Sequence, residues 1–588
     1  MRRGRPRGAL FGAFVFGLLV LALPASSSAA PTWLAPQDLS ATGQNADGQE
    51  VALSPAGDAV AVWERPNGTN FIVQAATKPP GGAWGAAQNL SAAGQDASAE
   101  RVALDPAGNA VAVWERSNGT NFIVQAATEP AGGAWSAAQD ISAAGQDASV
   151  PHVALDAAGN ALAVWQRFDG VTPVVQAATK PPGGAWGAPQ TISGAYGFNP
   201  VVAVDAAGNA VAAWFHFDGA TNVAQAVTRP AGGTWSAPQT LSVAGEPATI
   251  PEVAIDPAGN ALAVWQRSDG SNYIIQAATK PAVGAWSTGQ DLSAPGQDAF
   301  GPHVAVDAAG NAVAIWYRSN GTINVTQAAT KPVGGAWSPA QDVSAGRGGI
   351  YPRVALDSAG NAVAVWQTSS GPNPTIQVAT KAAGGAWSSV QDLSAVGETD
   401  QYPELALDPA GDAALAWQHL GTNSIVRAVG RDAAGPVFAG LSIPARGTVG
   451  TRLSFSVSPF DVWSALGPAP IWSFGDGGTA AGTRVRHTYG RAGAHRVTLT
   501  QADAVGNQST TTRTITIAAA CVVPKVSGKT LARAKAAIAR AHCRTGKVTH
   551  AYSKKVRKGR VVSQSPKAGK RLTHGARVKL VVSRGKRR

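Results

Sequence analysis

The sequence has few cysteines and few charged residues. Each shortage argues against one kind of site or structure. Its 2 cysteines among 588 residues would make a poor zinc site by themselves. Only 14% of the residues are charged while 68 are glycine, so turns and strands are expected in place of long charged helices. After an apolar run at residues 9–23, the sequence has no other long apolar stretch. We therefore expect no membrane span in the mature chain. The length favours several domains.

The charges are also unevenly distributed along the chain. Residues 521–588 contain 21 Lys and Arg but no Asp or Glu. Residues 31–520 contain 23 Lys and Arg against 35 Asp and Glu, a balance of −12. An acidic body followed by a strongly basic end indicates the kind of partner rather than the fold.

The first thirty residues have the pattern of a secretory signal. Four arginines among the first seven residues precede an apolar run at 9–23, and small residues follow up to Ala30. A membrane anchor is the alternative, but the run is shorter than the roughly 20 residues that span a bilayer. We expect residues 1–30 to be a signal peptide and the protein to be secreted, extracellular or cell-wall associated.

A unit of about fifty residues occurs eight times and accounts for most of the chain. Each unit has four strand-length runs separated by turns, such as Asp105–Gly108 before the second run and 130–133 before the fourth, at 135–141. Its middle runs are apolar on both faces, as in the stacked sheets of a propeller. A parallel β-helix is the alternative, although its coils are usually shorter than fifty residues. The first tryptophan of the unit recurs at steps of 49 to 51 residues: Trp63, Trp114, Trp165, Trp214, Trp265, Trp316, Trp366 and Trp417.

The two ends of the repeat complement each other. The chain begins with a lone fourth strand at 33–40, and the last unit stops after its third strand near Val429. If the N-terminal strand completes the last sheet, no sheet edge is left exposed. We therefore predict an eight-bladed β-propeller over residues 31–430, closed by the N-terminal strand. The closure resembles that of WD-repeat propellers without the WD dipeptide, and the Asp-x-x-Gly turns resemble the Asp-box hairpins of sialidase-like propellers.

One aspartate begins the same turn in seven units, with Ser54 in the first. We expect each carboxylate to accept N–H groups of its own turn, with calcium binding as the alternative. The seven are Asp105, Asp156, Asp205, Asp256, Asp307, Asp357 and Asp408.

Four residues before each of these turns the repeat varies. Variable side chains on a rigid scaffold are where a ligand would be recognised, so this ring is our candidate for the propeller's binding site. A solvated loop edge is the alternative. The polar members are Glu50, Arg101, His152, Glu252, His303, Arg353 and Glu404, with Val201 in the fourth unit. Because no acid or nucleophile has a fixed spacing to the histidines, we predict no enzyme activity, cofactor or metal.

After a linker at 431–436, residues 437–519 change character. Trp472-Ser-Phe474-Gly-Asp476-Gly is followed by His487-Thr-Tyr489. This segment resembles the PKD domain, an immunoglobulin-like β-sandwich that mostly serves as a spacer or protein-contact module. Asp476 is interpreted as a turn residue.

Residues 520–588 resemble a PASTA domain, a small α+β module. The similarity rests on Val523-Pro524, Gly528, a helix at 531–541 and Gln564-Ser565-Pro566. Thr530 is placed to cap the helix. Cys521 and Cys543, in an exported protein, are expected to form a disulfide that holds the helix to the sheet.

The PASTA resemblance implies peptidoglycan fragments as ligands, and the charge implies salt-sensitive attraction to an anionic polymer. Nucleic acid is not expected, because Tyr552 is the module's one aromatic residue. Docking on the protein's own acidic body is an alternative. The candidate anion-binding residues are Lys554, Lys555, Arg557, Lys558, Arg560, Lys567, Lys570 and Arg571.

Together these features predict a monomeric, cell-envelope-associated binding protein. Its PASTA module would bind peptidoglycan or another anionic wall polymer, and its propeller would recognise a glycan or protein. A glycoside hydrolase on a sialidase-like propeller and a secreted interaction scaffold are the alternative functions.

Overall fold

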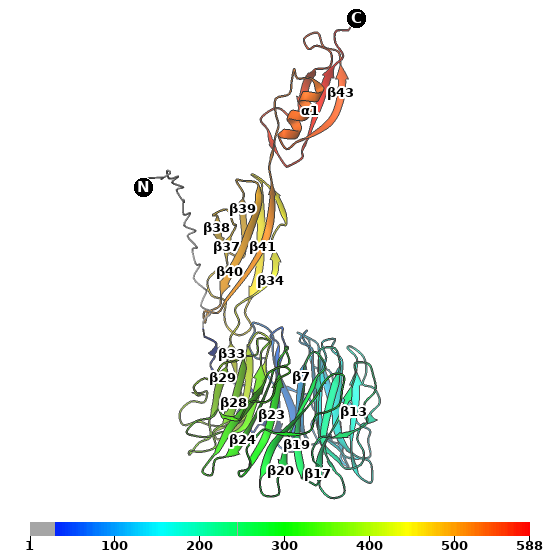
Figure 1. The fold of residues 1–588 in the computed structure, drawn as a ribbon, viewed down its shortest axis with the longest axis vertical. Coiled ribbons are helices and arrows are strands. Elements are labelled where there is room, and N and C mark those ends of the chain that lie inside the picture. The colour runs from blue at the N-terminus through cyan, green and yellow to red at the C-terminus, as the bar shows by residue number, and fades with distance from the viewer. Residues whose placement is uncertain (1–29, 244, 588) are drawn as a thin grey trace, which may run out of the picture.

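The computed structural model describes residues 30–243 and 245–587, which form three parts in a row (Figure 1). We call them the repeat body (32–432), the sandwich (433–518) and the terminal module (520–587). The regular secondary structure of the described residues is almost entirely strand, with one helix, and that helix is too short to span a membrane. The signal-peptide prediction falls on residues outside this range.

The described residues of the repeat body form eight antiparallel sheets in chain order. The first four are β3 (Asp47–Leu53), β4 (Ala59–Pro66), β5 (Phe71–Lys78) and β6 (Gln88–Asn89); β7 (Ala97–Leu104), β8 (Ala110–Ser117), β9 (Phe122–Glu129) and β10 (Gln139–Asp140); β11 (Ala148–Leu155), β12 (Ala161–Phe168), β13 (Pro173–Lys180) and β14 (Gln190–Thr191); and β15 (Gly197–Val204), β16 (Ala210–Phe217), β17 (Asn222–Arg229) and β18 (Gln239–Thr240).

The other four sheets are β19 (Ala248–Ile255), β20 (Ala261–Ser268), β21 (Tyr273–Lys280) and β22 (Gln290–Asp291); β23 (Ala299–Val306), β24 (Ala312–Ser319), β25 (Asn324–Lys331) and β26 (Gln341–Asp342); β27 (Ile350–Leu356), β28 (Ala362–Gln367), β29 (Ile376–Lys381) and β30 (Gln391–Asp392); and β31 (Thr399–Leu407), β32 (Ala413–Leu420) and β33 (Ser424–Asp432) with the N-terminal β1 (Thr32–Trp33) and β2 (Gln37–Asp38).

The first strand of each sheet contacts the first strands of both neighbouring sheets, and β31 of the last sheet contacts β3 of the first. The N-terminal strands pair with β33, with Thr32 opposite Asp432 and Gln37 opposite Ala428. The N-terminal segment therefore completes the last sheet. Because β33 continues to Asp432, residues 431 and 432 lie in a strand rather than in a linker.

The fourth strand of each sheet is shorter than the sequence indicates. The run predicted at 135–141 pairs as a ladder only at Gln139–Asp140. Before it, Ser136 exchanges two hydrogen bonds with Thr128, through its own N–H and through its hydroxyl. Because a side chain replaces the backbone there, the ladder is interrupted.

The core of the repeat body lies between its sheets. All eight repeating tryptophans are fully buried. Trp165, for example, packs with Ala161 and Ala163 of its own sheet against Val111 and Val113 of the preceding sheet. Alanine on one face and larger side chains on the other let the sheets stack closely, which explains why both faces are apolar.

The turn aspartates have the structural role that the sequence predicts. Asp105 Oδ1 accepts hydrogen bonds from the N–H groups of Ala107 and Asn109, both at 2.9 Å. Its Oδ2 accepts one from Asn109 Nδ2 at 2.7 Å. In the first sheet, Ser54 Oγ accepts the equivalent bonds from Ala56 and Asp58.

The sandwich has two sheets, with orders β34-β36-β39 and β35-β41-β40-β37-β38. Trp472, Phe474 and Tyr489 are fully buried between them, and Tyr489 donates a hydrogen bond to the Phe474 carbonyl at 3.2 Å. Asp476 accepts a turn N–H from Gly478, as expected of a turn residue, and also contacts His487 at 2.8 Å. The strands are β34 (Val437–Ser442), β35 (Arg446–Thr448), β36 (Arg452–Phe460), β37 (Ile471–Ser473), β38 (Thr479–Ala481), β39 (Arg484–Thr488), β40 (Gly493–Ala502) and β41 (Gln508–Ala518).

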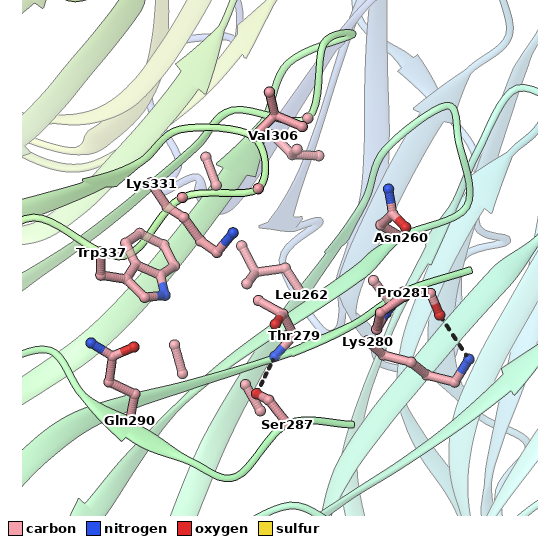
Figure 2. A pocket seen from close by; sticks show the side chains of 18 of the residues that line it. Asn260, Leu262, Thr279, Lys280, Pro281, Ser287, Gln290, Val306, Lys331 and Trp337 are labelled. Atoms are coloured by element: carbon pink, nitrogen blue, oxygen red, sulfur yellow. Dashed lines mark hydrogen bonds between the residues drawn. The ribbon is translucent and has the colours of Figure 1, made fainter. Parts of the chain in front are cut away.

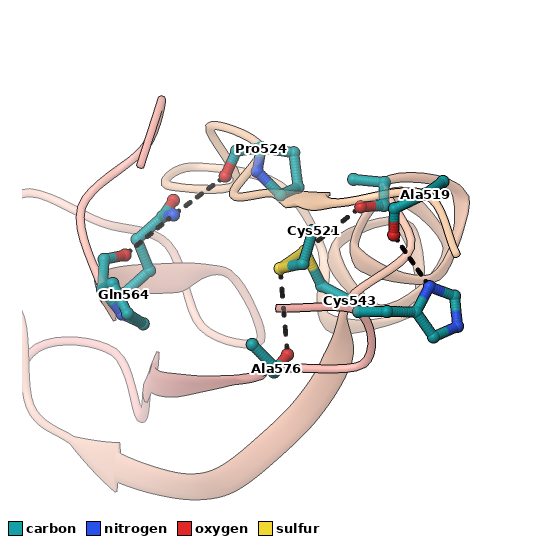
Figure 3. Close-up of a disulfide and its surroundings, with 9 residues drawn as sticks. Ala519, Cys521, Pro524, Cys543, Gln564 and Ala576 are labelled. Atoms are coloured by element: carbon teal, nitrogen blue, oxygen red, sulfur yellow. Dashed lines mark hydrogen bonds between the residues drawn. A yellow bond between two sulfur atoms is a disulfide. The ribbon is translucent and has the colours of Figure 1, made fainter. Parts of the chain in front are cut away.

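The terminal module packs one helix against a small sheet. The elements are β42 (Cys521–Val522), α1 (Leu531–Arg540), β43 (Arg544–Ala551), β44 (Val561–Ser565), β45 (Arg571–Leu572) and β46 (Arg577–Ser583). The predicted disulfide between Cys521 and Cys543 is present and buried (Figure 3). Thr530 occupies the N-cap of α1, but its side chain makes no capping hydrogen bond. Its backbone forms a β-bridge with Arg560.

Candidate functional site

The seven polar residues predicted to form a binding ring all lie on the first strands of their sheets. Two ion pairs join neighbouring sheets within this ring. Arg101 contacts Glu50 at 3.1 Å, and Arg353 donates two hydrogen bonds to Glu404, at 2.7 and 2.5 Å. These four side chains keep 15–37% of their surface exposed, so they are accessible to water. Glu252 has no ion-pair partner among the described residues.

Partial burial changes the protonation of the ring. Burial raises the pKa of Glu50 to about 7 against the attraction of Arg101, and raises the pKa of Glu252 to about 7 as well. Burial, with nearby arginine, lowers the pKa of His152 and of His303 to about 3. At neutral pH the histidines are uncharged and two of the three glutamates are partly protonated. The ring is therefore close to electrically neutral.

Each first strand also carries a bulge just before the ring residue, and the bulged residue has a positive φ. Such a conformation favours glycine, which stands there only as Gly48 and Gly301. The other six sheets place side chains in this strained backbone: Ala99 (φ 54°), Val150 (51°), Asn199 (49°), Ile250 (51°), Tyr351 (52°) and Tyr402 (56°). The side chains of Asn199, Ile250, Tyr351 and Tyr402 are exposed, and strain kept at exposed residues marks functional candidates.

Aromatic rings gather around two of these bulges. Five side chains form a continuous series of ring contacts across four sheets, with centroids 5.1–6.0 Å apart. We call this series the aromatic arc; it consists of Tyr273, Phe300, Tyr317, Tyr351 and Tyr402. Tyr273, Tyr351 and Tyr402 are 37–45% exposed. Sequence reasoning missed the arc because its members come from four different positions of the repeat.

The aromatic arc faces away from the sandwich. β33 runs from Ser424 to Asp432, and Asp432 leads into the sandwich. The first and third strands of every sheet run in the same direction, so all of them end on the side of the sandwich. The starts of these strands therefore lie at the end of the repeat body that is farthest from the sandwich. Tyr273 begins β21, and Tyr351 and Tyr402 lie near the starts of β27 and β31. We call this end the free face; it is the lower end of the repeat body in Figure 1.

A hollow of about 880 Å³ lies between the fifth and sixth sheets (Figure 2). Lys280 and Thr279 of one sheet and Lys331 and Trp337 of the next line it. A similar hollow of about 380 Å³, lined by Lys180 and Arg229, lies between the third and fourth sheets. The hollow is thus a feature of how adjacent repeats stack.

A second group of ionisable residues lies at the free face of the last sheet. His419 Nδ1 is 2.7 Å from Asp400, which is fully buried. Glu398, beside them, accepts a hydrogen bond from Arg427 at 2.9 Å. At least one oxygen of each acid in this group therefore has a partner, whereas Asp400 Oδ2 is buried without one.

The eight candidate basic residues of the terminal module are all exposed, but they form two groups. Lys554, Lys555, Arg557, Lys558 and Arg560 lie beside the C-terminal tail, because Ser553 N–H donates to Gly585 and Ser583 Oγ to Val556. Lys567, Lys570 and Arg571 lie near the chain's entry into the module, where Val523 N–H donates to Lys570.

A hollow of about 510 Å³ beside the first basic group was not predicted from the sequence. Lys558 and Arg584 contribute its charge, and His550 and Tyr552 line it as well. The Arg584 guanidinium lies 5.9 Å from the centre of the Tyr552 ring. Cations beside an aromatic ring suit an anionic ligand that also carries an apolar or ring-shaped part.

Comparisons with known proteins agree with the two C-terminal resemblances. Residues 433–518 match the PKD domain, and residues 522–584 match the PASTA domain. No curated protein matches the chain by sequence.

Solved structures resemble the fold only distantly. One is a protein of unknown function from Dyadobacter fermentans, with 11% identity over 68% of this chain and 99% of that chain and a TM-score of 0.38. Another is a Hadza microbial sialidase, with 10% identity over 65% of each chain and a TM-score of 0.35. A third is puromycin hydrolase, with 15% identity over 72% of this chain and 65% of that chain and a TM-score of 0.39.

Proposed function

We propose that this is a cell-envelope binding protein whose terminal module binds peptidoglycan or another anionic wall polymer while its repeat body recognises a second ligand. PASTA domains are generally associated with peptidoglycan-related ligands. The observation that carries the proposal is the unopposed charge of the module: eight exposed basic residues on a segment without a single acid. Such a surface attracts a polyanion strongly at low ionic strength.

The arrangement of the three parts supports this proposal over docking of the module on the acidic body. In Figure 1 the terminal module and the repeat body lie at opposite ends of the molecule, separated by the sandwich. The basic surface is therefore free to meet an external polymer, and the free face of the repeat body points the other way.

The experiment is co-sedimentation of the mature chain, residues 31–588, with purified peptidoglycan sacculi across a salt series. Replacing Lys554, Lys555, Arg557 and Lys558 by alanine should reduce binding at least about tenfold and flatten its salt dependence. A matched control removes four lysines of the repeat body: Lys180, Lys280, Lys331 and Lys381. Absence of sedimentation at low salt, or equal loss in the control, would contradict the proposal.

For the repeat body we infer a single eight-bladed propeller that works as a binding platform rather than as an enzyme. The contact of β31 with β3 and the pairing of β1 with β33 support a closed ring. The two arginines of the binding ring, Arg101 and Arg353, are already paired with glutamates. This pairing disfavours a cluster of free arginines that would bind a substrate carboxylate. Hydrolysis of any member of a glycan panel by the mature chain would overturn the binding-only function.

The aromatic arc favours a neutral polysaccharide as the second ligand. Tyrosine offers an apolar ring for stacking and a hydroxyl for hydrogen bonding, which together suit sugar rings. Glutamine side chains lie close by: Gln367 Oε1 accepts the Tyr402 N–H at 3.1 Å, and Gln401 donates to Gln418 at 3.3 Å. The repeat body is acidic and its binding ring is close to electrically neutral, so it should not attract a polyanion to the free face.

Calorimetric titration of the mature chain with cellohexaose, xylohexaose and N-acetylchitohexaose tests this ligand class. Tyr351→Gly with Tyr402→Gly should reduce binding at least about tenfold, since a stacked aromatic contributes about 1 kcal/mol or more. Glycine suits the positive φ at both sites, so the fold should persist. Phe122→Ala removes an exposed ring outside the arc and serves as control. Binding of a polyproline peptide but none of the sugars would contradict the proposal.

A further inference from the structure

Three buried aspartates meet where the repeat body joins the sandwich. Asp432 is the last residue of β33, Asp461 follows β36, and Asp503 follows β40. They are 0%, 4% and 3% exposed, and one carboxylate oxygen from each lies within 4.8 Å of the others. One ligand-bearing residue thus comes from the repeat body and two come from the sandwich.

Each carboxylate uses one oxygen to hold local structure. Asp461 Oδ1 accepts the N–H groups of Trp463 and Ser464. Asp503 Oδ1 accepts three N–H groups of its own turn, at 2.6–2.9 Å. Asp432 Oδ1 accepts a hydrogen bond from Asn507 Nδ2 at 2.9 Å. The carboxylates are therefore fixed in place by the protein itself.

Two of the remaining carboxylate oxygens are buried without partners. Asp432 Oδ2 and Asp503 Oδ2 are buried and accept no hydrogen bond. Asn507, which is 1% exposed and bonded to Asp432 through its Nδ2, leaves its Oδ1 without a partner as well. A buried polar oxygen without a partner costs about 1–3 kcal/mol, so several at one place indicate a missing partner.

No protein cation fills this role among the described residues. Lys78 of β5 is the nearby one, and its charge attracts Asp461 and Asp432, but it forms no ion pair with them. Its ammonium instead donates to the Val462 carbonyl at 2.5 Å and lies 4.2 Å from the centre of the Trp463 ring. None of the three aspartates forms an ion pair.

We propose that Asp432, Asp461, Asp503 and Asn507 bind a Ca²⁺ ion that joins the repeat body to the sandwich. The available atoms are all carboxylate or amide oxygens, the ligands that a hard divalent cation prefers, whereas zinc favours nitrogen and sulfur. Ca²⁺ suits the site better than Mg²⁺, because it tolerates irregular geometry and sheds its water more readily. This inference does not depend on the proposed function.

The position of the ion gives it a mechanical role. Asp432 is paired with Thr32 of β1, the strand that completes the last sheet. Binding would therefore fix the orientation of the sandwich and hold the end of β33 where the N-terminal strand pairs with it. Loss of the ion would leave three like charges at the junction and loosen both contacts.

The test is Ca²⁺ binding to the mature chain after removal of bound metal with EGTA. Calorimetry should give one tight equivalent, and Tb³⁺ should show luminescence sensitised by the adjacent Trp463. Asp461→Asn and Asp503→Asn should each weaken binding at least about tenfold. Asp476→Asn in the sandwich and Glu398→Gln in the other acidic group should leave the affinity within twofold.

Thermal unfolding separates a metal site from a merely repulsive cluster. With a Ca²⁺ site, Asp461→Asn should raise the Tm in EGTA, where it removes repulsion, and lower it relative to the unmodified chain in Ca²⁺. Absence of Ca²⁺ and Tb³⁺ binding at millimolar concentration would overturn the proposal. So would an Asn variant that is more stable than the unmodified chain in both conditions.

Discussion

Trp114 donates its indole N–H to Gln125 Oε1 at 3.2 Å, and Gln125 in turn donates its Nε2 to Asp140 at 2.7 Å. This relay crosses the second, third and fourth strands of one sheet. It recurs in the sheets of Trp265, Trp316 and Trp366, and in the sheet of Trp63 with Asn89 in place of the aspartate. Where Thr191 replaces the aspartate, Gln176 reaches the hydroxyl only at 3.4 Å, and the indole N–H of Trp165 has no partner.

We therefore expect Thr191→Asp to complete the relay in the third sheet. The aspartate should orient Gln176 toward Trp165 and satisfy a buried donor, a gain of about 1 kcal/mol. A Tm increase measured by calorimetry checks this. The increase should vanish when Gln176 is also replaced by leucine, and an equal gain in that background would contradict the relay.

We expect Glu100 to destabilise the folded repeat body. It is fully buried, neither carboxylate oxygen has a hydrogen-bond partner, and burial with repulsion from Glu64 raises its pKa well above the usual range. Six of the other sheets have proline at this place, namely Pro151, Pro200, Pro251, Pro302, Pro352 and Pro403.

Glu100→Pro should therefore stabilise the ring by about 1 kcal/mol or more at pH 8. Glu100→Gln, which keeps the size but removes the charge, should recover part of the gain. Thermal unfolding at pH 8 measures both variants. A lower Tm for both would show that the carboxylate has an unrecognised partner.

Replacing one partner of the ion pair between Arg353 and Glu404 should destabilise the protein more than replacing both partners. Arg353→Met leaves Glu404 unpaired beside Glu50 and should cost about 2 kcal/mol, a value reduced for partial exposure. Arg353→Met combined with Glu404→Met should recover much of this loss. Calorimetric Tm values of the three proteins test it, and additive losses would refute the pairing argument.

Glu252 and His303 should make opposing contributions to the pH dependence of the repeat body's stability. The raised pKa of Glu252, about 7 in the folded chain against 4.5 in the unfolded one, gives stability that is fully present below pH 4.5 and is lost as the pH rises from 4.5 through 7. The lowered pKa of His303, about 3 against 6.5, makes stability fall as the pH drops from 6.5 toward 3. Between pH 4.5 and 6.5 the two contributions should largely cancel.

A Tm profile from pH 4.5 to pH 8.5 tests both contributions. Glu252→Gln should leave a Tm that rises with pH up to about 6.5, and His303→Asn should leave a Tm that falls with pH up to about 7. A profile unchanged by either substitution would show that other groups determine the pH dependence.

Removing the disulfide should destabilise the terminal module alone. Cys521 and Cys543 are 22 residues apart, and opening a loop of this size costs about 3 kcal/mol. Cys521→Ser with Cys543→Ser should lower the calorimetric transition of this module and leave that of the repeat body unchanged. A matching shift in the repeat body would show that the parts unfold together.

The sequence predicts the local rules of this fold well, because they act within a few residues. The Asp105 turn is complete in four residues, and the burial of Trp472 and Phe474 follows from alternation along one strand. The disulfide was predicted from the expected export and the presence of only two cysteines. The length of the fourth strands was missed, because the side chain of Ser136 competes with the backbone for Thr128.

The candidate binding surfaces were predicted only in part. The members of the binding ring could be predicted because its seven polar residues share one position of the repeat. Their pairing across sheets could not be predicted from a linear pattern. The aromatic arc draws Tyr273, Phe300 and Tyr351 from different positions, so no periodicity reveals it. Spatial neighbours on adjacent sheets can be about fifty residues apart in the chain.

The sequence by itself determined the repeating unit, its turns and the identity of the two C-terminal modules, since each depends on short-range spacing of residue types. Only the tertiary structure decided which charges meet. Asp432 and Asp503 are 71 positions apart and gain significance when the sandwich docks on the repeat body. Burial then turns three ordinary aspartates into a site, because a carboxylate removed from water needs a partner that only the folded chain can place beside it.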